Sequence, residues 1–306
     1  MRILLIAGGW SNERDVALSG AKGIARALER LGHDVVRFDP AVEFDALSDL
    51  AARCDFAFIN LHGAPGEDGL IQALLDVVAC PYQGAGPAGS FLALNKVAAK
   101  QIFRRLGLRT PDWEFLPTPP APGWIPKLPF PLFAKSNNGG SSLDMCYARD
   151  LRELDTGLKT LFAKGCEVLV ETAVPGVEVT CGVLGDAALP PILIRPLCSN
   201  EFFDYRSKYE QDGADEICPA PIGPELTAKV MDLALAAHRC LGLKGYSRAD
   251  FMLKDNTFYL LEVNTLPGMT PTSLIPKAAA AAGLCFEDLI VRLIELGMAP
   301  GKGADG

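Results

Sequence analysis

Short apolar runs alternate with a stretch of helical periodicity along the first sixty residues, and this alternation restricts the possible folds more than any other feature. The runs at 2–7, 34–38 and 56–61 are predicted strands, and residues 16–31 have apolar positions at helical spacing before Gly32, a typical helix C-cap. Strands that alternate with helices form a parallel sheet, whose ligands bind at the carboxyl ends of the strands. We therefore expect an α/β protein.

The pattern changes after a predicted helix at 90–106, because residues 117–131 are too rich in proline for a central helix or strand. We interpret that segment as a linker or surface excursion and residues 198–217 as a polar, irregular loop. The remaining predicted strands are 132–135, 167–171, 178–184, 248–253 and 257–263, and the remaining predicted helices are 151–163, 224–241 and 286–296. A length of 306 residues suggests two or three domains.

The last predicted strand ends in two oxygen-bearing side chains, Glu262 and Asn264, which share one face because they are two residues apart. A short hairpin connection brings Asp250 alongside them. Three oxygen ligands suit Mg²⁺ bound together with waters and phosphates. The alternative is that the carboxylates are neutralised within the protein, by Arg248, Lys277 or a helix terminus.

Several glycine-containing loops follow predicted strands. The segment 135–142 (Lys-Ser-Asn-Asn-Gly-Gly-Ser-Ser) could wrap an anionic oxygen or be an ordinary flexible loop. Residues 84–89 match Gly-x-Gly-x-x-Gly, but the interior proline favours a turn into the next helix over a dinucleotide site. His62 could present its ring to a ligand or be structural, and Glu13 could bind an amine or, as the sequence position favours, cap the following helix.

The overall charge argues against some classes of partner. A net charge of −8 and a pI near 5.0 are unsuitable for a protein that binds the phosphate backbone of nucleic acid. No apolar stretch approaches the roughly 18 residues of a membrane span, and the apolar run at the N-terminus is too short for a signal sequence. We expect a cytoplasmic protein that acts on small molecules, without a nucleic-acid or membrane partner.

Five segments, in order, resemble the D-alanine:D-alanine ligases of the ATP-grasp group, and the resemblance extends over about 2–296. The matching segments are 8–16 (Gly-Gly-Trp-Ser-Asn-Glu-Arg-Asp-Val), 61–72 (Leu-His-Gly-Ala-Pro-Gly-Glu-Asp-Gly-Leu-Ile-Gln), 201–209 (Glu-Phe-Phe-Asp-Tyr-Arg-Ser-Lys-Tyr), 245–251 (Gly-Tyr-Ser-Arg-Ala-Asp-Phe) and 262–276 (Glu-Val-Asn-Thr-Leu-Pro-Gly-Met-Thr-Pro-Thr-Ser-Leu-Ile-Pro).

The resemblance implies a three-domain ATP-grasp architecture with ATP between the central and C-terminal parts. The expected domains are an N-terminal α/β substrate domain at 1–85, a central ATP-grasp domain at 86–175 and a C-terminal catalytic domain at 176–306. The implied cofactors are ATP and two Mg²⁺ ions, for which Mn²⁺ could substitute. The expected partners are D-alanine and a second copy of the chain, in a homodimer.

The resemblance also assigns roles to individual residues. Contacts to ATP are implied for Lys96, Lys135 and Lys208 (phosphates), Glu171 and Val174 (adenine) and Glu178 (ribose). The implied metal ligands are Asp250, Glu262 and Asn264. Contacts to the two substrate molecules are implied for Glu13 and His62 (first ammonium group) and for Ser273 and Leu274 (second carboxylate). The implied donors to the developing oxyanion are Arg248 and the backbone of Gly268. A hydrogen-bonded trio that keeps a loop closed is implied for Glu13, Ser141 and Tyr209.

The implied reaction joins two D-alanine molecules through an acyl phosphate, for peptidoglycan precursor synthesis. One alternative is a related ligase that uses D-lactate or another amino acid, and another is a nucleotide-binding regulator without turnover. The sequence has Asp144 where the family usually has glycine, which would add a carboxylate near the phosphate loop.

Overall fold

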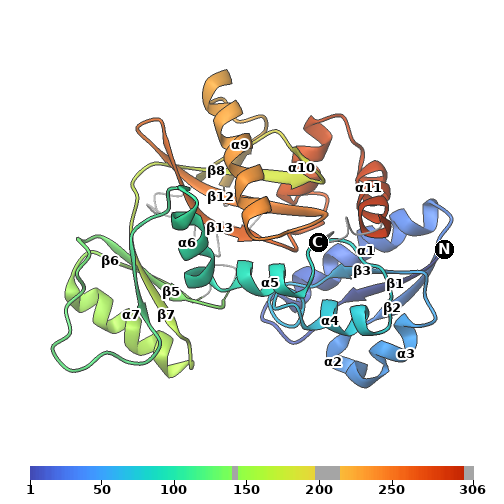
Figure 1. Cartoon of the computed structure of the whole chain (residues 1–306), viewed down its shortest axis with the longest axis horizontal. Coiled ribbons are helices and arrows are strands. Elements are labelled where there is room, and N and C mark those ends of the chain that lie inside the picture. Colours follow the sequence, from blue (N-terminus) through green and yellow to red (C-terminus); the bar gives the residue numbers. More distant parts are fainter. Residues whose placement is uncertain (140–143, 197–213, 300–306) are drawn as a thin grey trace, which may run out of the picture.

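The computed structural model describes residues 1–139, 144–196 and 214–299, and these form three sheets with helices packed around them (Figure 1). The first sheet is parallel, in the order β2-β1-β3, which confirms the predicted parallel sheet. Its strands are β1 (Arg2–Ala7), β2 (Asp34–Phe38) and β3 (Phe56–Asn60).

Helices lie in the connections between the strands of this sheet and after its last strand. The helix α1 spans Arg14–Arg30, and Gly32 follows it with a φ of 80°, as expected for a C-terminal glycine. The shorter helices are α2 (Pro40–Glu43), the 3₁₀ turn η1 (Phe44–Ala46), α3 (Leu47–Ala51) and α4 (Leu70–Val77). The sequence prediction did not include these four elements.

The predicted helix at 90–106 is instead two helices, α5 (Pro87–Leu94) and α6 (Lys96–Arg105). Asn95 separates them because its backbone is extended and its side chain accepts a hydrogen bond from the backbone N–H of Ala98, as an N-cap does. Gly86 precedes α5 as its N-cap, so the glycine motif at 84–89 is the predicted turn into a helix. Because of this break, Lys96 is the first residue of α6.

The second sheet is antiparallel, in the order β4-β7-β5-β6, with α7 against one face (Figure 1). Its elements are β4 (Trp113–Leu116), β5 (Leu132–Ser136), β6 (Met145–Ala148), α7 (Leu151–Ala163) and β7 (Val168–Thr172). Residues 117–131 contain neither helix nor strand, which confirms the proline-rich excursion. The sheet leads directly into the glycine loop after β5.

The third sheet has the order β11-β10-β8-β12-β13, and β9 pairs with β8. Its strands are β8 (Val177–Leu184), β9 (Ala187–Ala188), β10 (Ile192–Pro196), β11 (Ala214–Ile217), β12 (Tyr246–Lys254) and β13 (Thr257–Asn264), and its helices are α9 (Pro224–Cys240), α10 (Leu274–Ala281) and α11 (Phe286–Met298). Part of the predicted loop at 198–217 is thus strand β11, and the remainder lies outside the described residues. The predicted hairpin between β12 and β13 is confirmed.

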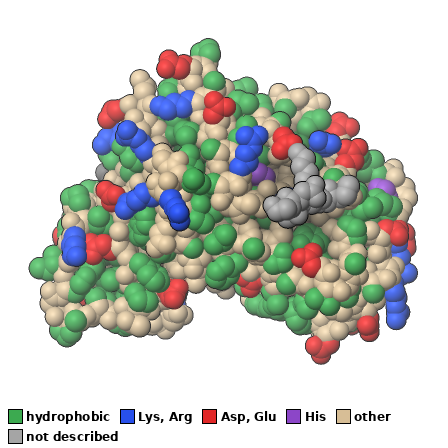
Figure 2. Space-filling model, viewed as in Figure 1, with side chains coloured by type: hydrophobic (Ala, Val, Ile, Leu, Met, Phe, Trp, Pro, Cys, Tyr) green, Lys and Arg blue, Asp and Glu red, His purple; other side chains and the backbone are tan. Residues whose placement is uncertain are grey.

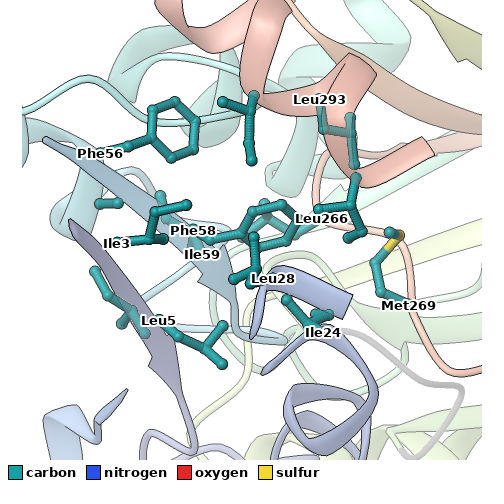
Figure 3. Close-up of a cluster of buried hydrophobic side chains, with 14 of the residues drawn as sticks. Ile3, Leu5, Ile24, Leu28, Phe56, Phe58, Ile59, Leu266, Met269 and Leu293 are labelled. Carbon is teal, nitrogen blue, oxygen red and sulfur yellow. The ribbon is translucent and has the colours of Figure 1, made fainter. Parts of the chain in front are cut away.

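The hydrophobic cores cross the expected domain boundaries. Figure 3 shows Leu266, Met269 and Leu293, from the C-terminal third, beside Phe58 and Leu28 in the core of the first sheet. A second core combines α5 and α6 with the third sheet and α9. The first core therefore joins the first and third sheets, and the second joins α5 and α6 to the third sheet. None of the described helices combines the length and apolar character needed to cross a bilayer.

Candidate active site

A cavity of about 480 Å³ collects residues from all parts of the chain. Its wall includes Gly139 from the loop after β5, together with residues around the first and third sheets. The sequence-predicted site residues that line it are Glu13, His62, Lys96, Glu178, Arg248, Asp250, Glu262, Asn264, Gly268, Ser273 and Leu274. Ser141, Lys208 and Tyr209 lie outside the described residues. The remaining three, Lys135, Glu171 and Val174, do not line this cavity.

Adjacent strands bring the predicted metal ligands together. In the antiparallel pairing of β12 with β13, Asp250 is opposite Glu262 and Arg248 is opposite Asn264. Asp250 is 4% exposed, and the hydroxyl of Thr180 on β8 donates to its Oδ1 at 2.6 Å. All three predicted ligands offer hard oxygen atoms to one cavity, so the donor set fits Mg²⁺.

Arg248 also pairs with Asp250. Neutralisation by a cation of the protein, which the sequence analysis raised as the alternative to a metal site, is therefore present for this carboxylate. Its Nε lies 2.8 Å from Asp250 Oδ1 and its Nη2 lies 2.7 Å from Oδ2, a bidentate contact. Although burial opposes the charged guanidinium, the Asp250 carboxylate raises the pKa of Arg248. Lys277, in contrast, pairs with Glu216 at 2.5 Å. The cation beside Asp250 therefore comes from its own strand.

Lys96 and Lys135, two of the lysines predicted to contact phosphate, pair with different carboxylates. Lys96 Nζ lies 3.4 Å from Glu262 Oε2 and donates to the carbonyl of Gly139 at 2.5 Å, so it ties the glycine loop to the acidic strand. Lys135 Nζ lies 2.5 Å from Glu171 Oε1 on the neighbouring strand.

The N-terminal loop that carries Glu13 is held by a buried turn. Arg14 donates to the carbonyl of Gly9 at 2.7 Å and pairs with Asp39, which accepts from Gly9 N–H at 3.0 Å. A side chain at Gly8 would collide with the Asp39 carboxylate. Glu13 occupies the N-cap position of α1 but its side chain makes no capping hydrogen bond, so the favoured capping interpretation is wrong. Its side chain instead lines the cavity.

Two titratable side chains on the loop after β3 are buried beside the cavity. Burial lowers the pKa of His62 to about 4, so the ring is neutral at physiological pH. Burial, reinforced by the charge of Glu13, raises the pKa of Glu67 to about 8. The sequence analysis did not single out Glu67, although it lies within the segment 61–72. Its position next to a buried strand end was the available signal.

The loop before α10 forms a compact corner in the cavity wall. Ser273 Oγ accepts from the backbone N–H of Thr270 at 3.0 Å and lies 2.7 Å from Thr270 Oγ1. A Cβ at Gly268 would lie 2.8 Å from Ser273 Oγ, so the close approach requires glycine. Leu274 begins α10, which places a helix N-terminus, favourable to anions, at the cavity.

Asp144 has a basic partner at the edge of the glycine loop. Its Oδ1 lies 2.6 Å from Lys164 Nζ, just after α7, and its side chain is 25% exposed. The sequence suggested an additional carboxylate near the phosphate loop, and in the structure this carboxylate forms an ion pair with Lys164. The sequence analysis did not identify Lys164 as the partner, because Lys164 lies twenty positions from Asp144 and nothing in the local sequence indicates the pairing.

The three sheets and the lysine- and carboxylate-lined cavity define an α/β protein of the ATP-grasp class. The family model for the D-ala D-ala ligase C-terminus matches residues 102–295. The chain belongs to the D-alanine–D-alanine ligase family.

Similar proteins match over nearly the whole chain. The D-alanine–D-alanine ligase of Nitratidesulfovibrio vulgaris is 62% identical over 97% of this chain and 98% of its own. The one from Desulfovibrio desulfuricans is 63% identical over 99% of both chains. Among solved structures, the Bacillus anthracis ligase has a TM-score of 0.85 and 35% identity over 97% of both chains, and its complex with ATP has a TM-score of 0.84 and 34% identity over the same shares.

Proposed function

We propose that this protein joins two D-alanine molecules to D-alanyl-D-alanine at the expense of ATP, which yields ADP and phosphate, and that the dipeptide serves peptidoglycan precursor synthesis. The observation that carries the proposal is the single cavity in which Lys96, Arg248 and the Asp250–Glu262 strand pair face Glu13. Relatives of 62–63% identity that are named for this reaction support it. A cavity of about 480 Å³ with several charged side chains in its wall suits small molecules such as amino acids better than a polymer.

ATP would lie between the second and third sheets. Lys96, Lys135 and Lys208 would neutralise its phosphates, Glu171 and Val174 would contact adenine, and Glu178 would contact the ribose. The structural neighbour complexed with ATP supports this nucleotide. Two Mg²⁺ ions held by Asp250, Glu262 and Asn264 would neutralise phosphate charge and polarise the transferred group.

In the first step, the carboxylate of one D-alanine attacks the γ-phosphorus of ATP. A C–O–P bond forms, the bond to the ADP oxygen breaks, and the product is an acyl phosphate. Two anions must approach each other, so Lys96 and the guanidinium of Arg248 stabilise the reacting oxygens. Glu13 would hold the ammonium group of this D-alanine, and His62, which lines the same cavity and is neutral, adds no competing positive charge.

In the second step, the neutral amine of another D-alanine attacks the acyl carbon. The peptide bond forms, the bond from the acyl carbon to the phosphate oxygen breaks, and the proton that the amine loses leaves with the phosphate. Arg248 and the backbone N–H of Gly268 would donate to the oxyanion. Ser273 and Leu274 at the start of α10 would hold the carboxylate of the attacking molecule, where the helix dipole favours an anion. Closure by Glu13, Ser141 and Tyr209 would exclude water that hydrolyses the acyl phosphate.

The proposal includes the cellular setting and assembly. We expect a cytoplasmic homodimer with the domains 1–85, 86–175 and 176–306. On the face shown in Figure 2, acidic and basic side chains of the described residues are interspersed, which suits a small-molecule enzyme better than a nucleic-acid binder.

Product identification tests the function directly. The full chain is incubated with ATP and Mg²⁺ and with D-alanine, L-alanine, or D-alanine plus D-lactate. ADP and D-alanyl-D-alanine should accumulate in equal amounts, only with D-alanine and only with metal. A faster formation of ester than of dipeptide would favour the D-lactate ligase, and nucleotide binding without any product would favour the regulator.

A further inference from the structure

Lys100 is a fully buried cation to which neither the sequence nor the proposed reaction assigns a role. It lies one turn after Lys96 on α6, but its side chain is 0% exposed and it does not line the cavity. Its Nζ lies 2.5 Å from Thr110 Oγ1, 2.9 Å from Glu171 Oε2 and 5.4 Å from the centre of the Trp113 ring. A lysine in such a place is rare unless it is paired.

The partner of Lys100 is shared between two lysines. Glu171 on β7 is 3% exposed; its Oε1 contacts Lys135 and its Oε2 contacts Lys100. Burial disfavours the charged carboxylate, but the two ammonium groups lower the pKa of Glu171, so it is ionised. Burial lowers the pKa of Lys100 to about 8 against the opposing effect of Glu171. Each carboxylate oxygen thus has one cation.

The two cations have different tasks in the proposed reaction. Lys135 would share its ammonium N–H donors between the ATP phosphates and Glu171, and this sharing would weaken its ion pair with Glu171. Lys100 cannot do this, because its side chain is 0% exposed, against 11% for Lys135, and it is enclosed by Thr110 and Trp113. Glu171 therefore has one partner that the nucleotide competes for and one that it cannot reach.

We propose that Lys100 is a positioning residue that keeps the Glu171 carboxylate ionised and fixed, so that Glu171 selects a nucleotide base carrying an amino group. The inference rests on the proposed function, in which Glu171 contacts adenine. An ionised carboxylate only accepts hydrogen bonds and matches the 6-amino group of adenine, whereas a protonated carboxyl also donates and tolerates a 6-oxo group. Without Lys100, Glu171 would take up a proton or turn towards Lys135.

The test compares ATP with inosine triphosphate, which has a 6-oxo group, as substrates of the full-length enzyme. Lys100→Met keeps the length and removes the charge, and Lys100→Arg keeps the charge. Arg104→Met is the matched control, because Arg104 is on the same helix and also stacks on Trp113 at 4.1 Å, but pairs with the exposed Asp112. The KM for each nucleotide, the KM for D-alanine and kcat are measured.

We expect Lys100→Met to raise the KM for ATP about tenfold or more, with a smaller change in kcat and in the KM for D-alanine. The preference for ATP over inosine triphosphate should fall about fivefold or more, while Lys100→Arg recovers most of it. Arg104→Met should behave as the wild type. An unchanged nucleotide preference in a folded Lys100→Met enzyme, or a matching loss in Arg104→Met, overturns the proposal.

A double variant covers the case in which Lys100→Met does not fold. Lys100→Met combined with Glu171→Gln removes both charges of the Lys100–Glu171 pair, which is far less costly than leaving one of them unpaired, and the amide oxygen of the glutamine can still accept from Lys135. It should match Glu171→Gln alone in the KM for ATP. A further loss of more than about threefold would mean that Lys100 acts independently of Glu171, which overturns the proposal.

The same series separates this inference from the function on which it rests. A wild-type enzyme that forms no dipeptide would refute the proposed function. An active wild type whose KM for ATP is insensitive to Glu171→Gln would refute the adenine contact and the inference with it. An active enzyme that is sensitive to Glu171→Gln but not to Lys100→Met would refute only the role of Lys100.

Discussion

Replacement of His238 by asparagine should remove part of the acid sensitivity of the fold. His238 lies near the end of α9, is 4% exposed, and its Nδ1 is 2.8 Å from the hydroxyl of Ser247. Burial, with a contribution from the charge of Arg239, lowers its pKa from 6.5 to about 4. The folded state therefore holds a neutral ring over a pH range in which the unfolded chain is protonated.

The sign and size of the effect follow from proton linkage. A lowered pKa in the folded state gives a stability contribution that is present above pH 6.5 and is lost as the pH falls towards 4. At pH 5 the loss is about 2 kcal/mol, since about 1.5 pH units below the unfolded pKa correspond to that free energy at 1.36 kcal/mol per unit. Asparagine does not titrate and retains a polar group for Ser247.

Other buried titratable groups also make the stability of the fold depend on pH. The prediction therefore compares the wild type with a variant at each pH instead of using the absolute stability of either. His62, with a pKa of about 4, acts in the same direction. Glu67, whose pKa is raised to about 8, acts in the opposite direction, because its contribution is complete below pH 4.5 and is lost as the pH rises through 8. The difference between the wild type and His238→Asn cancels both contributions.

Urea unfolding at pH 7.5 and pH 5 measures this difference. His238→Asn should be less stable than the wild type at pH 7.5, because the substitution removes packing, and this deficit should shrink by about 2 kcal/mol at pH 5. His33→Asn is the control; His33 is only partly buried, so its deficit should change much less. A deficit for His238→Asn that is equal at both pH values would refute the argument.

Three further predictions concern the site. Glu262→Gln should lower kcat by more than about tenfold with an unchanged circular dichroism spectrum, because a metal ligand loses its charge but keeps its shape; near-normal turnover would show a structural strand only. Gly268→Ala should raise the KM for D-alanine, because its Cβ would displace Ser273 Oγ from a distance of 2.8 Å; initial rates at varied D-alanine test this, and an unchanged KM would count against the second-substrate site. Asp144→Gly should alter the KM for ATP less than about twofold, since its carboxylate pairs with the half-exposed Lys164 and solvent screens such a pair; a tenfold change measured at two salt concentrations would show that Asp144 acts on the nucleotide.

Local patterns determined some of the elements and the hairpin that carries the acidic residues. The helix α7 spans Leu151–Ala163 as predicted, because its apolar periodicity lies between Asp150, which caps it, and Gly165. In the hairpin between β12 and β13, a register shift between Asp250 and Phe251 places Asp250 opposite Glu262. The turn of this hairpin has a local reason, because its residues Asp255 and Asn256 tolerate a positive φ. These features depend on neighbours a few residues away, which a single sequence displays.

The tertiary structure decided which charges meet. The sequence allowed Arg248 or Lys277 as a partner of the acidic strands; Arg248 pairs with Asp250, two residues further along the same strand, whereas packing placed Lys277 on Glu216. The site also needed residues that have no local signature, above all Lys100, whose partner Glu171 is seventy-one positions away on another element. Local periodicity records which face of an element is buried, whereas the identity of a buried ionic partner depends on how separate elements pack, and desolvation makes only the paired arrangement tolerable.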